Sequence, residues 1–189
     1  MINPYLISTN YQKILRFFVF SPRGQSFYER EVARKTGLSP SSAHYALSHL
    51  YRAKLINRKQ NGRMCFYSID ESNPYLREFK VLSNLLLIEP LIEKLKRLSH
   101  KIILFGSWAE GSDTEDSDID LFIISSEKEK VLSIVDNFSY STKFENRKIQ
   151  PIISQPEELL KKDRKNKVFL EQVEKGKILW EREINEDIL

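Results

Sequence analysis

The chain has 189 residues, which is enough for one domain with a large core or for two small domains. Hydrophobic residues make up 41% of it and charged residues 30%, a balance typical of globular proteins. The sequence has no apolar run near the ~20 residues of a membrane span, no N-terminal signal and only one cysteine, Cys65, so it excludes an internal disulfide and predicts a cytoplasmic protein without a membrane partner.

The net charge of +4 is unevenly distributed along the chain. Residues 1–70 carry 11 Lys and Arg against 3 Asp and Glu, whereas residues 71–189 carry 19 against 23. A basic N-terminal part beside an acidic C-terminal part favours a polyanion as the partner of the first. It favours cations as ligands of the second.

The first part of the chain predicts three helices. Apolar residues at helical spacing indicate a helix over residues 10–20. The S-x-x-E pattern of residues 26–29 predicts a capping box that opens a second helix, which ends at Gly37. A serine cap and a first-turn proline then open a third helix over residues 40–54. The short connection at Gly37 is typical of a helix-turn-helix.

Two short strands follow, over residues 55–60 and 63–69, with Asn61-Gly62 as the expected turn of a hairpin. Three helices and a hairpin make a winged helix, expected over residues 1–72. The run ARKTGLSPSSA at residues 33–43 is similar to that of many prokaryotic winged-helix regulators. DNA would then be contacted by the outward face of the third helix and by basic residues of the wing, namely Ser41, Ser42, Tyr45, Ser48, Arg58, Lys59 and Arg63. The alternative is a module that binds a protein partner, with the charges as a solvated face.

Residues 73–99 form a connecting segment whose apolar residues keep helical spacing on both sides of Pro90. The proline predicts two helices or a kink. The apolar stripe is wide, which favours packing within the chain over the alternative of a homodimer seam.

Residues 101–124 contain two apolar strands separated by a Gly-Ser turn. The first strand, over 101–105, ends at Gly106, and Ser107 is expected to cap a short helix over 108–110. Backbone N–H groups at the start of such a helix can bind phosphate.

A carboxylate pair opens the second strand. Asp118 and Asp120 are two residues apart and therefore project from the same face. Two like charges so placed require a cation, and Mg²⁺ prefers carboxylate oxygens together with substrate phosphates. The expected chemistry is phosphoryl or nucleotidyl transfer, and the alternative is an acidic surface turn.

This stretch resembles the G-S-x-x-x-G and S-D-I-D signature of the minimal nucleotidyltransferases of the DNA polymerase β superfamily. The resemblance covers about residues 100–182, within a domain expected over 100–189. It implies an α/β nucleotidyltransferase fold with a mixed sheet, so that the whole chain would be α+β. It also implies Mg²⁺ or Mn²⁺ at Asp118 and Asp120 and an NTP, as substrate or effector, held near Gly106, Ser107, Gly111 and Ser117.

The chain departs from the family pattern at one position. Active members carry a third carboxylate on a following strand, expected here over residues 147–153, where Gln150 stands instead and Glu145 is a displaced substitute. A neutral amide can ligate a metal but cannot act as a base.

Three functions therefore stay open. The first is Mg²⁺-dependent transfer of a nucleoside monophosphate from an NTP to an unidentified acceptor, which includes a protein acceptor, coupled to DNA binding. The second is a DNA-binding transcriptional regulator that binds nucleotide without turnover. The third is an antitoxin-like modifier of a partner protein.

The remaining elements complete an alternating pattern of helices and strands. Helices are expected over 131–138, from Pro156 onward and over 168–175, with a closing strand at 177–180. The basic run 161–167 is interpreted as a solvated helix face, with contact to a nucleic acid or nucleotide as the alternative.

Overall fold

The computed structural model describes residues 9–141, 147–156 and 167–182. The chain divides into two compact units, with the boundary between Leu86 and Leu87, and each unit has its own sheet. Helices together with antiparallel and mixed sheets make the fold α+β, as predicted. In the described part of the chain, no helix combines the length and the hydrophobicity that a membrane span requires.

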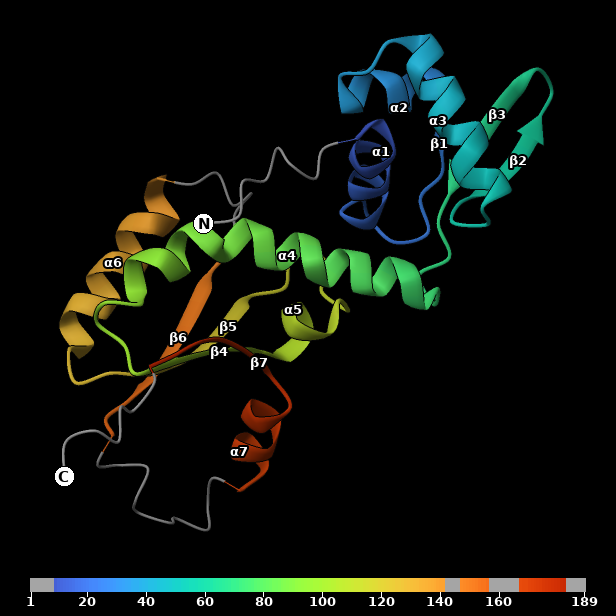
Figure 1. The fold of residues 1–189 in the computed structure, drawn as a ribbon. Helices are drawn as coiled ribbons and strands as arrows, with labels where there is room; N and C mark the ends of the chain where they lie inside the picture. Colours follow the sequence, from blue (N-terminus) through green and yellow to red (C-terminus); the bar gives the residue numbers. More distant parts are fainter. Residues whose placement is uncertain (1–8, 142–146, 157–166, 183–189) are drawn as a thin grey trace. The chain divides into compact units, whose positions relative to one another are not determined.

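The N-terminal unit packs helices against a small antiparallel sheet of order β1-β3-β2 (Figure 1). Its elements, with the helix that crosses the boundary, are α1 Asn10–Val19, β1 Phe27–Tyr28, α2 Glu29–Thr36, α3 Pro40–Arg52, β2 Asn57–Asn61, β3 Met64–Ser68 and α4 Pro74–Leu95. The helices bury their apolar faces in one core that includes Ile14, Phe18, Val32 and Leu47. Their periodic hydrophobic residues therefore account for this unit.

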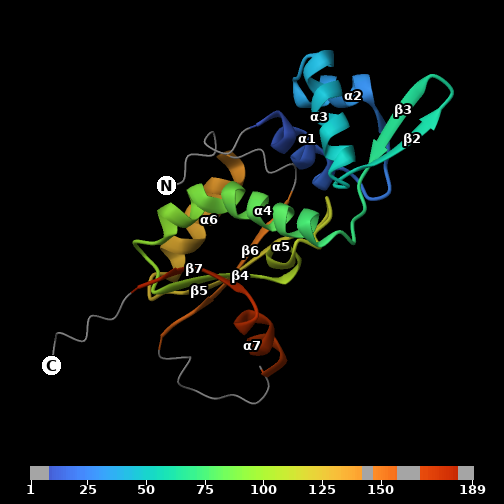
Figure 2. The ribbon, with the colours of Figure 1, turned by 45° about the vertical axis from the view of Figure 1, so that its right-hand side comes forward.

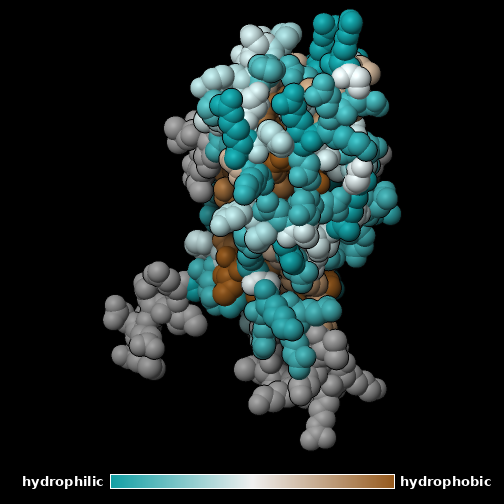
Figure 3. Space-filling model, turned by 90° about the vertical axis from the view of Figure 1, so that its right-hand side faces the viewer, coloured by the Kyte–Doolittle hydropathy of each residue, from teal (hydrophilic) through white to brown (hydrophobic). Residues whose placement is uncertain are grey.

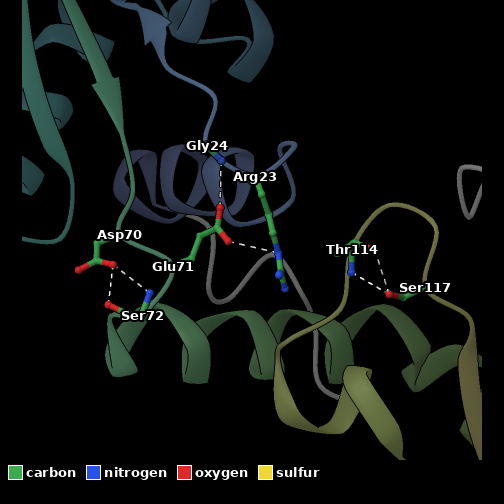
Figure 4. Close-up of polar contacts among 7 residues, drawn as sticks. All are labelled: Arg23, Gly24, Asp70, Glu71, Ser72, Thr114 and Ser117. Carbon is green, nitrogen blue, oxygen red and sulfur yellow. Dashed lines mark hydrogen bonds and ion pairs between the residues drawn. The ribbon is translucent and has the colours of Figure 1, made fainter.

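Local signals set the ends of these helices. Thr9 and Gln12 form a reciprocal capping box at the start of α1. Gly37, in the left-handed conformation with φ 68°, ends α2, and the Ser39 side chain accepts from the Ser42 N–H at the start of α3. The N–H of Gly24, in the loop after α1, donates to the carboxylate of Glu71, which precedes α4, at 3.0 Å (Figure 4).

The predicted capping box over residues 26–29 is wrong. Phe27 and Tyr28 form β1, which pairs with β3, and α2 starts at Glu29 without a side-chain cap. Phe27 is buried in the core, so burial and strand pairing outweigh the local capping signal.

The predicted turn of the hairpin is displaced by one residue. Asn61 belongs to β2 and pairs with Met64, which leaves Gly62 and Arg63 as the turn. Gly62 has φ 58°, a conformation that favours glycine, and its place in the turn sets the register of the two strands.

Pro90 does not split the connecting segment into two helices, because α4 continues through it. Proline has no N–H to donate to the carbonyl of Leu86, and this costs helix stability. Ile88, Leu91 and Ile92 on either side are nearly fully buried. Their burial offsets the cost of the proline.

The C-terminal unit is built on a mixed sheet of order β6-β5-β4-β7. Its elements are β4 Lys101–Phe105, α5 Gly106–Glu110, β5 Ile119–Ile124, α6 Lys128–Ser141, β6 Ile149–Ser154, α7 Lys167–Glu174 and β7 Lys177–Glu181. Strand β4 is antiparallel to β5 and β7, whereas β6 is parallel to β5. Helix α6 and the C-terminal part of α4 lie on one side of the sheet, and α7 lies on the other (Figures 1 and 2).

The side of the sheet that faces α7 is only partly covered by the described residues. Ile103, Phe105 and Phe122 pack there against Val173 of α7. Further toward β6 the same face carries Asp120, Gln150 and Ile152, which are partly or largely exposed. The helix expected after Pro156, most of the basic run 161–167 and Glu145 lie outside the described residues.

Polar side chains dominate the visible surface. On the face drawn in Figure 3, hydrophilic residues predominate and hydrophobic ones show between them. Among the described residues, the exposed large hydrophobic side chains come from several different elements. Tyr45, with 60% of its surface exposed, is the member of this group that lies on the predicted reading face of α3.

Candidate functional site

The turn between β4 and α5 brings backbone close to a carboxylate. Gly106, the first residue of α5, has φ 69°, which favours glycine. A Cβ atom on this residue would lie 2.6 Å from Oδ2 of Asp120, so a side chain would collide with the carboxylate. The predicted cap by the Ser107 side chain is wrong, because no side chain caps α5. The Ser107 carbonyl instead accepts from the Gly111 N–H, which ends the helix.

The carboxylate pair lies where β5 begins. Asp118 immediately precedes the strand, and Asp120 pairs with Phe105 of β4 and with Gln150 of β6. Ile119, between the two aspartates, is fully buried, whereas both aspartates are partly exposed on the opposite face. Burial raises the pKa of Asp120, and the neighbouring negative charge of Asp118 raises it further. The site therefore already favours a positive charge beside Asp120.

Gln150 lies at the same place. Its Nε2 amide donates a hydrogen bond to Oδ2 of Asp118, and its backbone is in register with Asp120. The described residues contain no cluster of three or more Asp, Glu, His and Cys side chains arranged to hold a metal. The oxygen donors brought together here are thus two carboxylates and one amide, whose carbonyl oxygen is also a metal ligand when the amide is turned.

The loop between α5 and β5 is held by short-range contacts. Gly111, with φ 72°, ends α5 in the left-handed conformation. The Ser117 hydroxyl accepts from the Thr114 N–H at 2.8 Å, as Figure 4 shows. Gly111 and Ser117, both expected near the nucleotide, therefore shape the loop that precedes Asp118.

The sequence interpretation missed two residues, one in this loop and one beside it. Asp113 is fully buried and forms an ion pair with Arg147, whose Nη1 lies 3.2 Å from Oδ2. The guanidinium of Arg147 lies 5.2 Å from the ring centroid of Trp108, in α5. In the sequence Asp113 is one acid among several in an acidic loop. No local pattern distinguishes it from its neighbours, because its burial comes from segments far apart in the chain.

The predicted DNA contacts are distributed over two surfaces of the N-terminal unit. On α3, Ser41 and Tyr45 are exposed and Ser42 and Ser48 partly exposed, opposite the buried Ala43, Leu47 and Leu50. The ring centroids of Tyr45 and His49 are 4.3 Å apart. A shallow pocket of about 550 Å³ lies between the start of α1 and the first turns of α3, lined by Thr9, Asn10, Tyr11, Ser41, Ser42, Tyr45 and Ala46.

The hairpin carries the basic residues. Arg58, Lys59 and Arg63 are exposed on β2 and on the turn. Nη2 of Arg58 donates to Sγ of Cys65 on the neighbouring strand at 2.9 Å. That contact holds the Arg58 guanidinium against the hairpin.

Residues 88–185 match the family described as polymerase beta, nucleotidyltransferase. The chain belongs to this family. The match includes every residue of the candidate nucleotide site, from Gly106 to Gln150, and supports a nucleotidyltransferase-type fold for the C-terminal unit.

The comparison with curated proteins gives no match. Among solved structures, the chain is similar to M. tuberculosis Rv0081 at 22% identity, over 48% of this chain and 85% of that one, with a TM-score of 0.36. It is also similar to NolR from Sinorhizobium fredii at 20% identity, over 48% of this chain and 94% of that one, with a TM-score of 0.30. Likenesses at these TM-scores carry no argument about fold or function.

Proposed function

We propose that the protein is a Mg²⁺-dependent nucleotidyltransferase that moves a nucleoside monophosphate from an NTP to an acceptor. The observation that carries the proposal is the placement of the Asp120 carboxylate against the Gly106 backbone, with Asp118 on the same face. In a member of the nucleotidyltransferase family, that arrangement would place a bound cation next to backbone that can bind phosphate.

The donor set fits Mg²⁺, with Mn²⁺ as a substitute. Both ions take carboxylate and carbonyl oxygens, and Asp118, Asp120 and Gln150 offer only such oxygens. When bound, the ion supplies charge that offsets the negative triphosphate. Asp118 and Asp120 would hold the cation, the absence of a side chain at Gly106 leaves room for the Asp120 carboxylate, and the phosphates would bind beside the cation at the backbone of residues 106 and 107.

A second candidate is a regulator that binds nucleotide without turning it over. One contact favours this candidate. Gln150, at the position where active family members are expected to carry a carboxylate, donates a hydrogen bond from its side-chain amide to Asp118. An amide cannot accept the proton of an attacking hydroxyl, and it adds no negative charge for a second cation. Any transfer is therefore expected to be slow.

We further propose that the N-terminal unit is a winged helix that binds DNA and so locates the nucleotidyltransferase. Three features support this proposal: the exposed polar face of α3, the basic hairpin β2–β3, and the excess of basic residues before residue 71. Phosphate contacts from Arg58, Lys59 and Arg63 would supply affinity, and Ser41, Ser42, Tyr45 and Ser48 would face the bases.

Calorimetry with a non-hydrolysable NTP, with and without Mg²⁺, tests the metal–nucleotide site. We expect Mg²⁺ to increase the affinity of the wild type by about tenfold or more, equivalent to about 1.4 kcal/mol. Asp118→Asn should abolish most of this dependence. Glu181→Gln, which changes an exposed ion pair with Lys101 in the same sheet, is the matched control and should keep it. Nucleotide binding that ignores both Mg²⁺ and the Asp118 substitution would refute the site.

Transfer of a labelled nucleoside monophosphate separates the two candidates. Gln150→Asp restores a carboxylate beside Asp118 and Asp120, so a slow transferase should become faster by about tenfold or more. If both the wild type and Gln150→Asp bind Mg²⁺ and nucleotide but neither transfers the nucleoside monophosphate, the second candidate, a regulator without turnover, is favoured.

A further inference from the structure

The ion pair between Asp113 and Arg147 is set apart by its burial. Asp113 is fully buried, and the Arg147 side chain is only 8% exposed. Other ion pairs among the described residues are more exposed; in Lys101–Glu181, for example, the two side chains are 25% and 53% exposed. Trp108, whose ring lies beneath the guanidinium, is 1% exposed.

These three residues come from three segments that also supply the candidate site. Trp108 belongs to α5, whose first residues are Gly106 and Ser107. Asp113 belongs to the loop that leads to Asp118. Arg147 stands three residues before Gln150, next to Lys148, whose carbonyl accepts from the Ile119 N–H at 2.8 Å.

A buried ion pair is a poor way to gain stability, because removing two charges from water costs about as much as their attraction returns. Its advantage is geometric. A guanidinium that is paired on its edge with one carboxylate and stacked on an indole ring has few other orientations. The pair is also neutral overall, so it leaves the negative charge of Asp118 and Asp120 available for a cation.

We propose that Asp113 and Arg147, stacked on Trp108, are positioning residues that hold the loop 111–118 and the start of β6 where the metal and the triphosphate bind. This inference rests on the proposed function and adds two residues to it. Neither residue is expected to touch the nucleotide. Both act by fixing the distance between Gly106, Asp118 and Gln150, and displacements of about 1 Å in such sites can cost up to about a hundredfold.

The experiment compares full-length variants for stability and for Mg²⁺-dependent binding of a non-hydrolysable NTP. Arg147→Met removes the charge and keeps much of the volume, Arg147→Lys keeps the charge without the planar fork, and Asp113→Asn keeps the shape of the carboxylate. Val135→Ala is the control for a general loss of stability, because it leaves a cavity where the Val135 side chain of α6 is only 1% exposed. Binding is measured at a temperature at which circular dichroism shows every variant to be folded.

We expect Arg147→Met and Asp113→Asn to weaken Mg²⁺–nucleotide binding by about tenfold or more, with Arg147→Lys in between. Val135→Ala should lower the melting temperature comparably and leave the affinity within about twofold of the wild type. Amide hydrogen exchange over residues 111–118 should be faster in the Asp113 and Arg147 variants and unchanged in Val135→Ala.

The outcomes separate this inference from the proposed function. If the wild type binds the nucleotide and the Asp113 and Arg147 variants bind equally well, the positioning role is refuted while the proposed function stands. The positioning role is also refuted if Val135→Ala loses as much affinity as the Asp113 and Arg147 variants for the same loss of stability. A wild type that binds no nucleotide would refute both proposals. Should Arg147→Met not fold, Asp113→Asn and Arg147→Lys decide the question.

Discussion

Gly106 is the residue at which backbone conformation and the chemistry of the site meet. Its φ of 69° already disfavours any side chain, and the space where a Cβ would lie is occupied by the Asp120 carboxylate. Asp120 in turn has a raised pKa because burial and the charge of Asp118 oppose its ionisation. The two carboxylates thus oppose each other's ionisation, which is consistent with the proposal that a cation binds between them.

Gly106→Ala should lower the free energy of unfolding by about 2–4 kcal/mol, the sum of a left-handed backbone and a collision with Asp120. Gly37→Ala is the matched control, because Gly37 has φ 68° and nothing lies within 4 Å of its Cβ position. The control should lose only about 1–2 kcal/mol. Urea unfolding followed by circular dichroism measures both, and equal losses would contradict the predicted collision.

Asp120→Asn should stabilise the metal-free protein at neutral pH. Since the pKa of Asp120 is raised in the folded state, the folded state binds the proton more tightly than the unfolded state, and stability falls as the pH rises through that pKa. We expect the variant to melt at a higher temperature than the wild type at pH 7, and the gain to shrink as the pH falls through the folded-state pKa.

Thermal melts across this pH range measure the Asp120 effect. Asp116→Asn, which removes an exposed charge from the loop before β5, should show no comparable gain. Added Mg²⁺ should raise the melting temperature of the wild type and leave Asp120→Asn nearly unchanged. If Asp120→Asn is less stable than the wild type at pH 7, the prediction is wrong and the ionised Asp120 carboxylate stabilises the fold.

At the scale of elements, α4 shows how burial overrides a local signal. Pro90 lies inside the helix with its own side chain exposed, and the helix continues because its neighbours are buried. Strand pairing has the same effect at β1, where a capping pattern is overruled by the core position of Phe27.

Pro90→Ala should raise the free energy of unfolding by about 1–3 kcal/mol, because alanine restores a helical N–H and removes the collision with the preceding turn. Pro74→Ala is the control, since Pro74 is the first residue of α4, where proline is tolerated. That substitution should change stability by less than about 0.5 kcal/mol. Denaturant midpoints measure both, and a destabilised Pro90→Ala protein would mean that the proline ring itself is needed.

At the scale of the whole molecule, the uneven charge predicts that the N-terminal part binds DNA and that the C-terminal part binds cations. Residues 1–70 carry an excess of eight positive charges, whereas the remaining residues are net negative. Family membership is shown for the C-terminal unit, and DNA binding by the N-terminal unit stays a prediction.

Full-length protein should bind duplex DNA with a strong dependence on salt. Replacing Arg58 and Arg63 together by alanine should reduce the slope of log affinity against log salt by about 2, since each phosphate contact contributes about 0.9. Lys128→Ala with Lys130→Ala, which removes two exposed lysines from α6, should leave the slope unchanged. Fluorescence anisotropy measures the slope, and affinity undetectable at ~50 mM salt would refute DNA binding.

The sequence by itself determined the features that depend on neighbours in the chain. Apolar periodicity located α1, α3 and α6, short apolar runs located β4 and β5, and the spacing of two residues put both aspartates on one face. Glycine and serine signals placed the end of α2 and the start of α3. Each of these depends on a few consecutive residues, whose steric and hydrogen-bonding preferences act over a single turn or strand.

Only the tertiary structure decided which distant residues meet. It placed the Gln150 amide on Asp118 through the parallel pairing of β5 and β6, and it buried Asp113 with Arg147 although 34 positions separate them. It also turned the capping pattern at residue 26 into a strand and carried α4 through Pro90. In the last two cases burial and strand pairing between remote segments outweigh local preferences, because the free energy of a buried contact exceeds that of a helix cap or a residue's propensity.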